Sequence, residues 1–120
     1  MPAAKSPLSR FSSAEITRMF KFAKRVIRHP SFDILISAAT QPVGRLLVVT
    51  SAKVGTAPTR NKIRRRCKEI FRKDQFFLQP YDCIMIAKKD APLCSYQDIQ
   101  ALISSAYQKA ASALDAHRPA

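Results

Sequence analysis

Residues 53–72 read KVGTAPTRNKIRRRCKEIFR, and this stretch predicts a single helix with one apolar face and one strongly basic face. Thr56 is a plausible N-cap and Pro58 suits the first turn, so we expect a helix from about Thr56 to Lys73. At 100° per residue, its large apolar side chains fall within an arc of about 100°, which can pack on a sheet. These side chains are Ile63, Cys67, Ile70 and Phe71.

Basic side chains cover most of the remaining circumference of this helix. From Arg60 to Lys73 there are eight basic residues and one acid, Glu69, so pairing along the helix cannot neutralise them. Five of the eight are arginine, which suits bidentate contact with phosphate. A solvated face that only aids solubility is the alternative, but ordinary surfaces mix both signs of charge. One flank beside the apolar arc combines Asn61, Arg65, Lys68 and Arg72, with Arg64 bordering the arc and Lys62, Arg66 and Lys73 on the far side.

The whole chain is basic too. Its 120 residues carry 21 Lys+Arg against 8 Asp+Glu, a formal net charge of +13, which makes nucleic acid the leading class of partner. No run of about 18 apolar residues could span a membrane, and the N-terminal residues lack the apolar centre of a signal peptide. We therefore expect a cytoplasmic protein with no membrane partner. Cys67, Cys83 and Cys94 lack the spacing of a zinc site or disulfide framework and are expected to be buried, reduced thiols.

The segments around the basic helix predict a small α+β protein. Ser12 and Glu15 have capping-box spacing before an amphipathic helix that we expect to fade near Arg28. Apolar runs at Phe32 to Ala38 and Leu46 to Thr50 favour a hairpin, and a third strand is expected at Cys83 to Ala87. A last helix follows Ser95. The expected order is α-β-β-α-β-α, with room for one further short strand, giving a small central β-sheet packed with three helices. The expected divisions are a flexible basic arm (1–11), one RNA-binding domain (12–115) and a C-terminal tail (116–120).

The acidic residues argue against catalysis by the protein alone. A metal-dependent nuclease needs carboxylates that converge on a cation, whereas the eight acids here are scattered singly along the chain. His29 and His117 lie in a loop and a tail, so a histidine pair for RNA cleavage is equally unconvincing. Whether the protein has a metal site of its own is left open.

Residues 60–65 (RNKIRR), with KVG at 53–55 before them and KEIFR at 68–72 after them, resemble the RNA-binding signature of the bacterial ribonuclease P protein component. The family has arginine where this chain has Lys62, which keeps the charge but loses the bidentate fork. The resemblance extends from about Ser12 to Leu114. It implies an α+β fold with an unusual left-handed βαβ crossover. It also implies an RNA-binding set made of Lys53, Arg60, Asn61, Lys62, Arg64, Arg65, Lys68 and Arg72.

The same resemblance implies a cleft for the single-stranded 5′ leader of precursor tRNA. Ile16, Phe20 and Leu35 correspond to leader-cleft positions, with Ile16 where the family often has phenylalanine. Asp33 also corresponds to a cleft position, where an acid would repel phosphate. From the residues alone, Phe11, Phe20, Phe22 and Phe32 could stack on unpaired bases, although at such spacing Phe20 and Phe32 are more often core residues.

The function implied by the resemblance is that of a holoenzyme subunit. Ribonuclease P is an endoribonuclease that removes the 5′ leader from precursor tRNA; its RNA subunit performs the hydrolysis with Mg²⁺, which is bound mainly through RNA. The expected partners are ribonuclease P RNA and precursor tRNA, with no protein partner required. The main alternative is a ribosomal or other structural RNA-binding protein. A DNA-binding module and a stand-alone hydrolase rank lower.

Overall fold

The computed structural model describes residues 11–115, and the side chains of residues 11–112. Residues 1–10 of the predicted arm (1–11) and all of the predicted tail (116–120) lie outside the described residues. The main elements are α1 (Ser13–Phe22), β1 (Lys24–Arg28), β2 (Phe32–Ala38), β3 (Leu46–Val49), α2 (Ala57–Lys73), β4 (Tyr81–Ala87) and α3 (Tyr96–Asp115). Short 3-10 helices occupy Ala52–Val54, Phe76–Leu78 and Ala91–Leu93. The expected α+β class and order are confirmed, and β1 is the further short strand.

The first helix ends at Phe22, so the prediction that it continues toward Arg28 is wrong. Residues Lys24–Arg28 instead form β1, which pairs antiparallel with β2 and places Ile27 opposite Ile34. Both isoleucines are buried. The adjacent β-branched residues Val26 and Ile27 suit a strand, and pairing with β2 outweighs the helical pattern of the preceding residues.

The four strands lie in the order β1-β2-β4-β3, so the predicted hairpin between β2 and β3 is also wrong. Strand β4 lies between them, antiparallel to β2 and parallel to β3. Its near-continuous burial explains the position, because an apolar strand is best covered when it is central. The β2–β3 connection crosses the end of β4 at Gly44, where any side chain would overlap the carbonyl oxygen of Tyr81.

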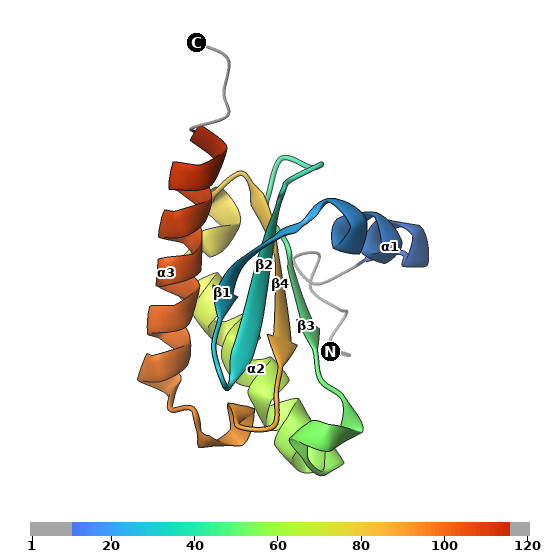
Figure 1. Ribbon diagram of the computed structural model, residues 1–120, viewed down its shortest axis with the longest axis vertical. Helices are drawn as coiled ribbons and strands as arrows, with labels where there is room; N and C mark the ends of the chain where they lie inside the picture. The colour runs from blue at the N-terminus through green and yellow to red at the C-terminus, as the bar shows by residue number, and fades with distance from the viewer. Residues whose placement is uncertain (1–10, 116–120) are drawn as a thin grey trace, which may run out of the picture.

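Helix α2 connects the parallel strands β3 and β4. In Figure 1 both strands run downward, α2 passes behind them, and β4 lies to the left of β3. This is the left-handed crossover implied by the resemblance, and it is opposite in hand to nearly all βαβ connections.

The two faces of the sheet are covered unequally (Figure 1). Helices α2 and α3 pack on one face, where they form the main core with Phe32, Ile34 and Met85. The other face is covered only in part by α1, whose Met19 packs with Leu35 and Ile84. The remaining part of this second face, which we call the open face, is available to a partner.

Local signals position the helices. Ser12 and Glu15 form the expected capping box, each side chain accepting a bond of 3.1 Å from the other residue's backbone N–H. Ser95 and Asp98 exchange equivalent bonds of 3.1 and 3.2 Å before α3. Thr56 occupies the N-cap of α2, but its hydroxyl lies 3.2 Å from that of Thr59 instead of capping a backbone N–H.

Candidate nucleic-acid interface

Helix α2 buries the predicted apolar arc and exposes the predicted basic flank. Ile63, Cys67, Ile70 and Phe71 are all buried against the sheet and α3. Their burial fixes the rotation of the helix, so the opposite positions face solvent. The exposed set includes Asn61, Arg65, Lys68 and Arg72.

Part of the predicted RNA-binding set gathers in one surface depression on α2. Asn61, Arg64, Arg65 and Lys68 line it together with Pro58. One guanidinium nitrogen of Arg64 donates to Oδ1 of Asn61 at 3.2 Å, which orients the guanidinium along the helix. Three cations therefore converge on one shallow site with no acid in its lining, which is suited to phosphate.

The other predicted positions on α2 lie around this depression. Arg72 is exposed one turn beyond Lys68, and Lys62 is exposed about 100° around the helix from Asn61. Arg60 is half-buried, and its Nε has no hydrogen-bond partner among the described residues. The structure thus does not bring all of the predicted set into one contact site.

A second basic site lies at the end of the sheet, and sequence reasoning identified only one of its residues. Lys53 lines a pocket together with Ser51, Val54 and Ala87 and with Lys88 and Lys89. The parallel strands β3 and β4 end at the same edge, so the lysines that follow each strand meet there. The sequence signal for this site was the pair Lys88-Lys89, which directly follows the third predicted strand. Placing this pair beside Lys53 required knowing that β3 and β4 are parallel neighbours.

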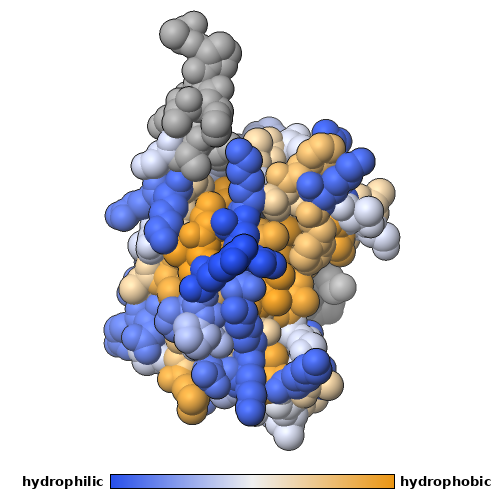
Figure 2. All heavy atoms as spheres, viewed as in Figure 1, coloured by the Kyte–Doolittle hydropathy of each residue, from blue (hydrophilic) through white to orange (hydrophobic). Residues whose placement is uncertain are grey.

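The open face combines an apolar floor with cations at one side. Leu47, Val49 and Ile86 are only partly buried there, beside the α1 contact. Arg25 and Arg28 are both exposed and project from β1. In the register of the two strands, they lie opposite Leu35 and Asp33 of β2. Figure 2 shows hydrophobic surface in the middle of the view with hydrophilic side chains running across it. Apolar surface beside cations is the combination that single-stranded nucleic acids require.

Asp33 lies on the open face as expected, but two cations offset its charge. Its carboxylate is 2.7 Å from Nζ of Lys88 and 3.6 Å from Nε of Arg25. Asp33 therefore positions Arg25 of β1 and Lys88, which follows β4, over the apolar residues of the open face. Repulsion of phosphate by Asp33 is reduced accordingly.

The phenylalanines divide between the core and the surface. Phe32 is fully buried, as the core interpretation predicted, whereas Phe20 is 43% exposed, so the core interpretation of Phe20 is wrong. Of the other two leader-cleft positions, Ile16 is half-buried and Leu35 is buried under its neighbours. Phe20 is therefore available for stacking, whereas Leu35 can contribute only to the floor.

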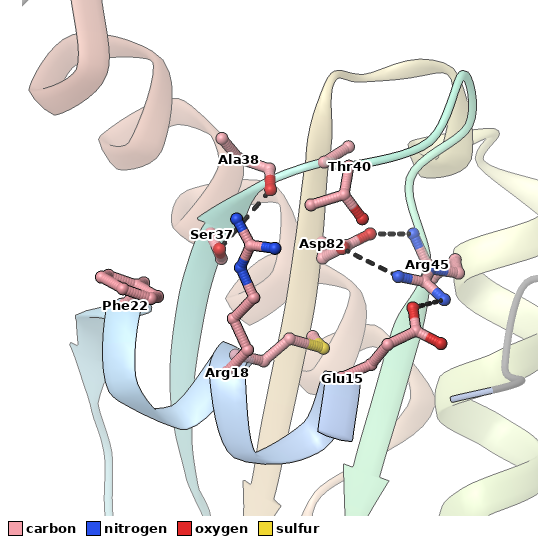
Figure 3. Close-up of a pocket in the computed structure, with 10 residues that line it drawn as sticks. Glu15, Arg18, Phe22, Ser37, Ala38, Thr40, Arg45 and Asp82 are labelled. Atoms are coloured by element: carbon pink, nitrogen blue, oxygen red, sulfur yellow. Dashed lines mark hydrogen bonds and ion pairs between the residues drawn. The ribbon is translucent and has the colours of Figure 1, made fainter. Parts of the chain in front are cut away.

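A buried arginine fixes α1 on the sheet (Figure 3). The Arg45 side chain is 3% exposed and lies 2.6 Å from Glu15 and 3.5 Å from Asp82, while its backbone N–H donates to Asp82 at 2.9 Å. The ring of Phe11, which was expected to end the flexible arm, stacks 4.4 Å from the guanidinium. The Ser12 backbone N–H and the Arg45 side chain lower the pKa of Glu15. Burial raises the pKa of Asp82 in spite of Arg45.

The described residues offer no cluster for a metal ion: no three His, Cys, Asp or Glu side chains converge among them. The three cysteines are buried and free, and burial raises the pKa of Cys67 to about 12, which leaves it an unreactive thiol. Among the described residues, no helix has the length and apolar character needed to cross a membrane.

Comparison with known proteins identifies the family. The ribonuclease P family model matches residues 10–111. Two ribonuclease P protein components, from Clostridium botulinum and Desulfatibacillum aliphaticivorans, are 36% identical over 70 residues and 38% identical over 80. These matches cover 57% and 66% of this chain and 63% and 65% of the relatives, so the chain spans slightly less than two thirds of their length. A third, from Aliivibrio salmonicida, is 35% identical over 92 residues, covering 76% of this chain and 78% of the relative.

Solved structures agree on the fold. The ribonuclease P protein of Staphylococcus aureus superimposes with a TM-score of 0.73 at 24% identity, over 86% of this chain and 94% of that one. The protein from Thermotoga maritima gives 0.70 at 22% identity, over 83% and 96%. With its left-handed crossover, its basic α2 and a family match over most of its length, the chain belongs to the ribonuclease P protein family.

Proposed function

We propose that this chain is the protein subunit of a ribonucleoprotein endoribonuclease that removes the 5′ leader from precursor tRNA. One observation carries the proposal: α2 and the open face each present cations beside a surface that RNA could occupy, and they meet at Lys53. This lysine belongs to the 3-10 helix directly before α2 and also lines the pocket with Lys88 and Lys89. A single RNA surface could therefore continue from α2 onto the sheet.

The two parts of this surface suit different RNAs. The depression on α2 is lined by three cations and has no aromatic side chain for a base to stack on, so it favours the backbone of a folded RNA, here the catalytic RNA subunit. The open face has an apolar floor, an exposed Phe20 and flanking cations, so it favours the unpaired leader. In this proposal Lys53, Lys88 and Lys89 hold leader phosphates where the two parts meet.

The protein's contribution to catalysis would be electrostatic. Its cations lessen the repulsion between substrate and catalytic RNA, so the holoenzyme should need less Mg²⁺. In this proposal the Mg²⁺ required for hydrolysis is bound mainly through RNA; among the described residues, no three His, Cys, Asp or Glu side chains converge. The proposed partners are the RNA subunit and precursor tRNA, without a second protein; a cytoplasmic location remains a prediction.

A ribosomal or other structural RNA-binding role is the second candidate, favoured by the high net charge alone. Such a protein would bind folded RNA through α2 but would have no use for an open face that suits a single strand. Dependence of binding on the leader therefore separates the two functions.

A cleavage assay at low Mg²⁺ tests the proposal. A bacterial ribonuclease P RNA is incubated with precursor tRNA, with this protein and without it, and the protein is also incubated with precursor tRNA alone. We expect correct 5′ cleavage only when the RNA subunit and the protein are both present. Tight binding to the RNA without rescue of cleavage would favour the structural role, and cleavage by the protein alone would favour a stand-alone hydrolase.

A further inference from the structure

Helix α1 presents aromatic side chains on two opposite flanks. Met19 points at the sheet and packs with Leu35 and Ile84. At 100° per residue, Ile16 and Phe20 lie on one side of Met19, whereas Phe22 lies on the other, about 160° around the helix from Phe20. The flank that bears Phe22 is therefore separate from the proposed leader surface.

A pocket of about 250 Å³ lies along this second flank, between α1 and the start of the β2–β3 connection (Figure 3). Arg18 and Phe22 come from α1, and Ser37 and Thr40 come from the opposite wall. The volume is just below the range of about 300–1,000 Å³ typical of ligand pockets, so it suits one ring system and not a larger molecule. The full lining is Glu15, Arg18, Met19, Phe22, Ser37, Ala38, Ala39, Thr40, Arg45 and Asp82.

The acidic groups of the pocket are already engaged. Glu15 and Asp82 both pair with the buried Arg45, so neither leaves an uncompensated negative charge. Arg18, in contrast, has no hydrogen-bond or ion-pair partner among the described residues, and its guanidinium extends from α1 toward Ser37 in Figure 3. The charged group left for a ligand is thus the Arg18 guanidinium, which can only donate hydrogen bonds and therefore favours an anionic ligand.

Phe22 supplies an aromatic surface at the same pocket. It is 62% exposed, although burying such a ring would normally stabilise the fold. Nζ of Lys21 lies 5.6 Å from its ring centroid, which adds positive charge beside the aromatic ring. The exposed ring can stack on a base and the guanidinium can pair with a phosphate, and these are the two kinds of contact that hold single-stranded nucleic acids.

We propose that this pocket binds one unpaired nucleotide of RNA, with its base stacked on Phe22 and its phosphate paired with Arg18. The inference rests on the proposed function, because it takes the ligand to be RNA that is already bound to the protein. The nucleotide could belong to the catalytic RNA or to the leader. In either case α1 would be held between two RNA contacts, one on each flank.

The test compares Arg18→Ala and Phe22→Ala with two matched controls, Lys109→Ala for the charge and Leu93→Ala for the exposed apolar group. Lys109 lies on the exposed side of α3 and Leu93 is 82% exposed, and neither lines this pocket or the RNA surfaces proposed above. Two affinities are measured for each variant: that of the protein for the RNA subunit, and that of the holoenzyme for precursor tRNAs with leaders of increasing length.

We expect Phe22→Ala to lose about 5- to 150-fold in one of these affinities, the range for loss of one stacked base, and the controls to match the wild type. Arg18→Ala should weaken the same affinity and lower its salt slope by about one. Loss confined to the RNA subunit identifies the catalytic RNA as the source, and loss that appears only with longer leaders identifies the leader. Unchanged affinities in both variants, with a wild type that binds RNA, would overturn the inference alone. A wild type that binds neither RNA would overturn the proposed function instead.

Discussion

The two faces of the sheet differ in what covers them. On the face toward α2 and α3, the strand residues Phe32, Ile34 and Met85 are fully buried by the protein's own helices. On the open face, Leu47, Val49 and Ile86 remain partly exposed, with cations on β1 to one side and lysines at the end of β3 and β4. Successive residues of one strand therefore have different roles: one stabilises the fold, and the next is left for a partner. In our proposal the single-stranded leader covers the open face when the holoenzyme binds its substrate.

Adjacent substitutions on β4 should separate these roles most strongly. Met85→Ala leaves a cavity in the covered face and should reduce the free energy of unfolding by about 2–5 kcal/mol. Ile86→Ala removes side-chain atoms that are already partly exposed, and should cost about 1 kcal/mol or less while weakening leader binding. Urea unfolding measures the first effect, and binding of precursor tRNA the second. Equal destabilisation by the two variants would mean that the protein's own packing covers both faces of the sheet alike.

Substitutions on α2 should affect RNA binding without affecting the fold. Arg65→Ala or Lys68→Ala should weaken binding to the RNA subunit and lower its salt slope by about one, because each removes one exposed cation from the depression. Lys109→Ala removes the same charge from α3 and serves as the control. If both α2 variants retained the salt dependence of the wild type, α2 would not be the phosphate-binding surface.

Neutralising Asp33 should make the open face more positive and strengthen its binding of RNA. Asp33→Asn releases Lys88 and Arg25 and removes an acid from the open face, so precursor tRNA should bind about two- to fivefold more tightly, in keeping with the modest energy of partly exposed ion pairs. Affinity should also become more salt-dependent. Weaker binding of precursor tRNA would mean that Asp33 orients the two cations for the leader, and that orientation matters more than net charge.

The smallest expected effect concerns the attachment of α1. Glu15 has a pKa below its ordinary value of 4.5, so the stability it contributes is present above 4.5 and is lost as pH falls through the lowered pKa. Asp82 acts in the opposite direction, since burial raises its pKa and its protonation at low pH relieves that cost. Glu15→Gln should therefore lose less stability than the wild type during acid titration, measured by urea midpoints. An identical acid response in both proteins would contradict this role for Glu15.

The sequence predicted α2 well and the open face poorly, for a physical reason. The rotation of α2 follows from its own apolar arc, Ile63 to Phe71, so local periodicity was enough to identify its exposed basic flank. The open face depends on the strand order, which local periodicity does not encode. The apolar runs of β2 and β3 looked like a hairpin, and only the structure shows β4 between them, with Lys88 and Lys89 beside Lys53. The exposure of Phe20 was missed likewise, because helical spacing alone cannot show that α1 covers only part of the sheet.

The central claim is that α2 and the open face bind different RNAs. The most direct test measures the affinity of the holoenzyme for precursor tRNA and for mature tRNA, using wild type, Phe20→Ala and the control Leu93→Ala. We expect Phe20→Ala to weaken binding of precursor tRNA by about fivefold or more, the value of one stacked base, and to leave binding of mature tRNA unaffected. If Phe20→Ala weakened both substrates equally, or weakened neither, the open face would not be the leader site.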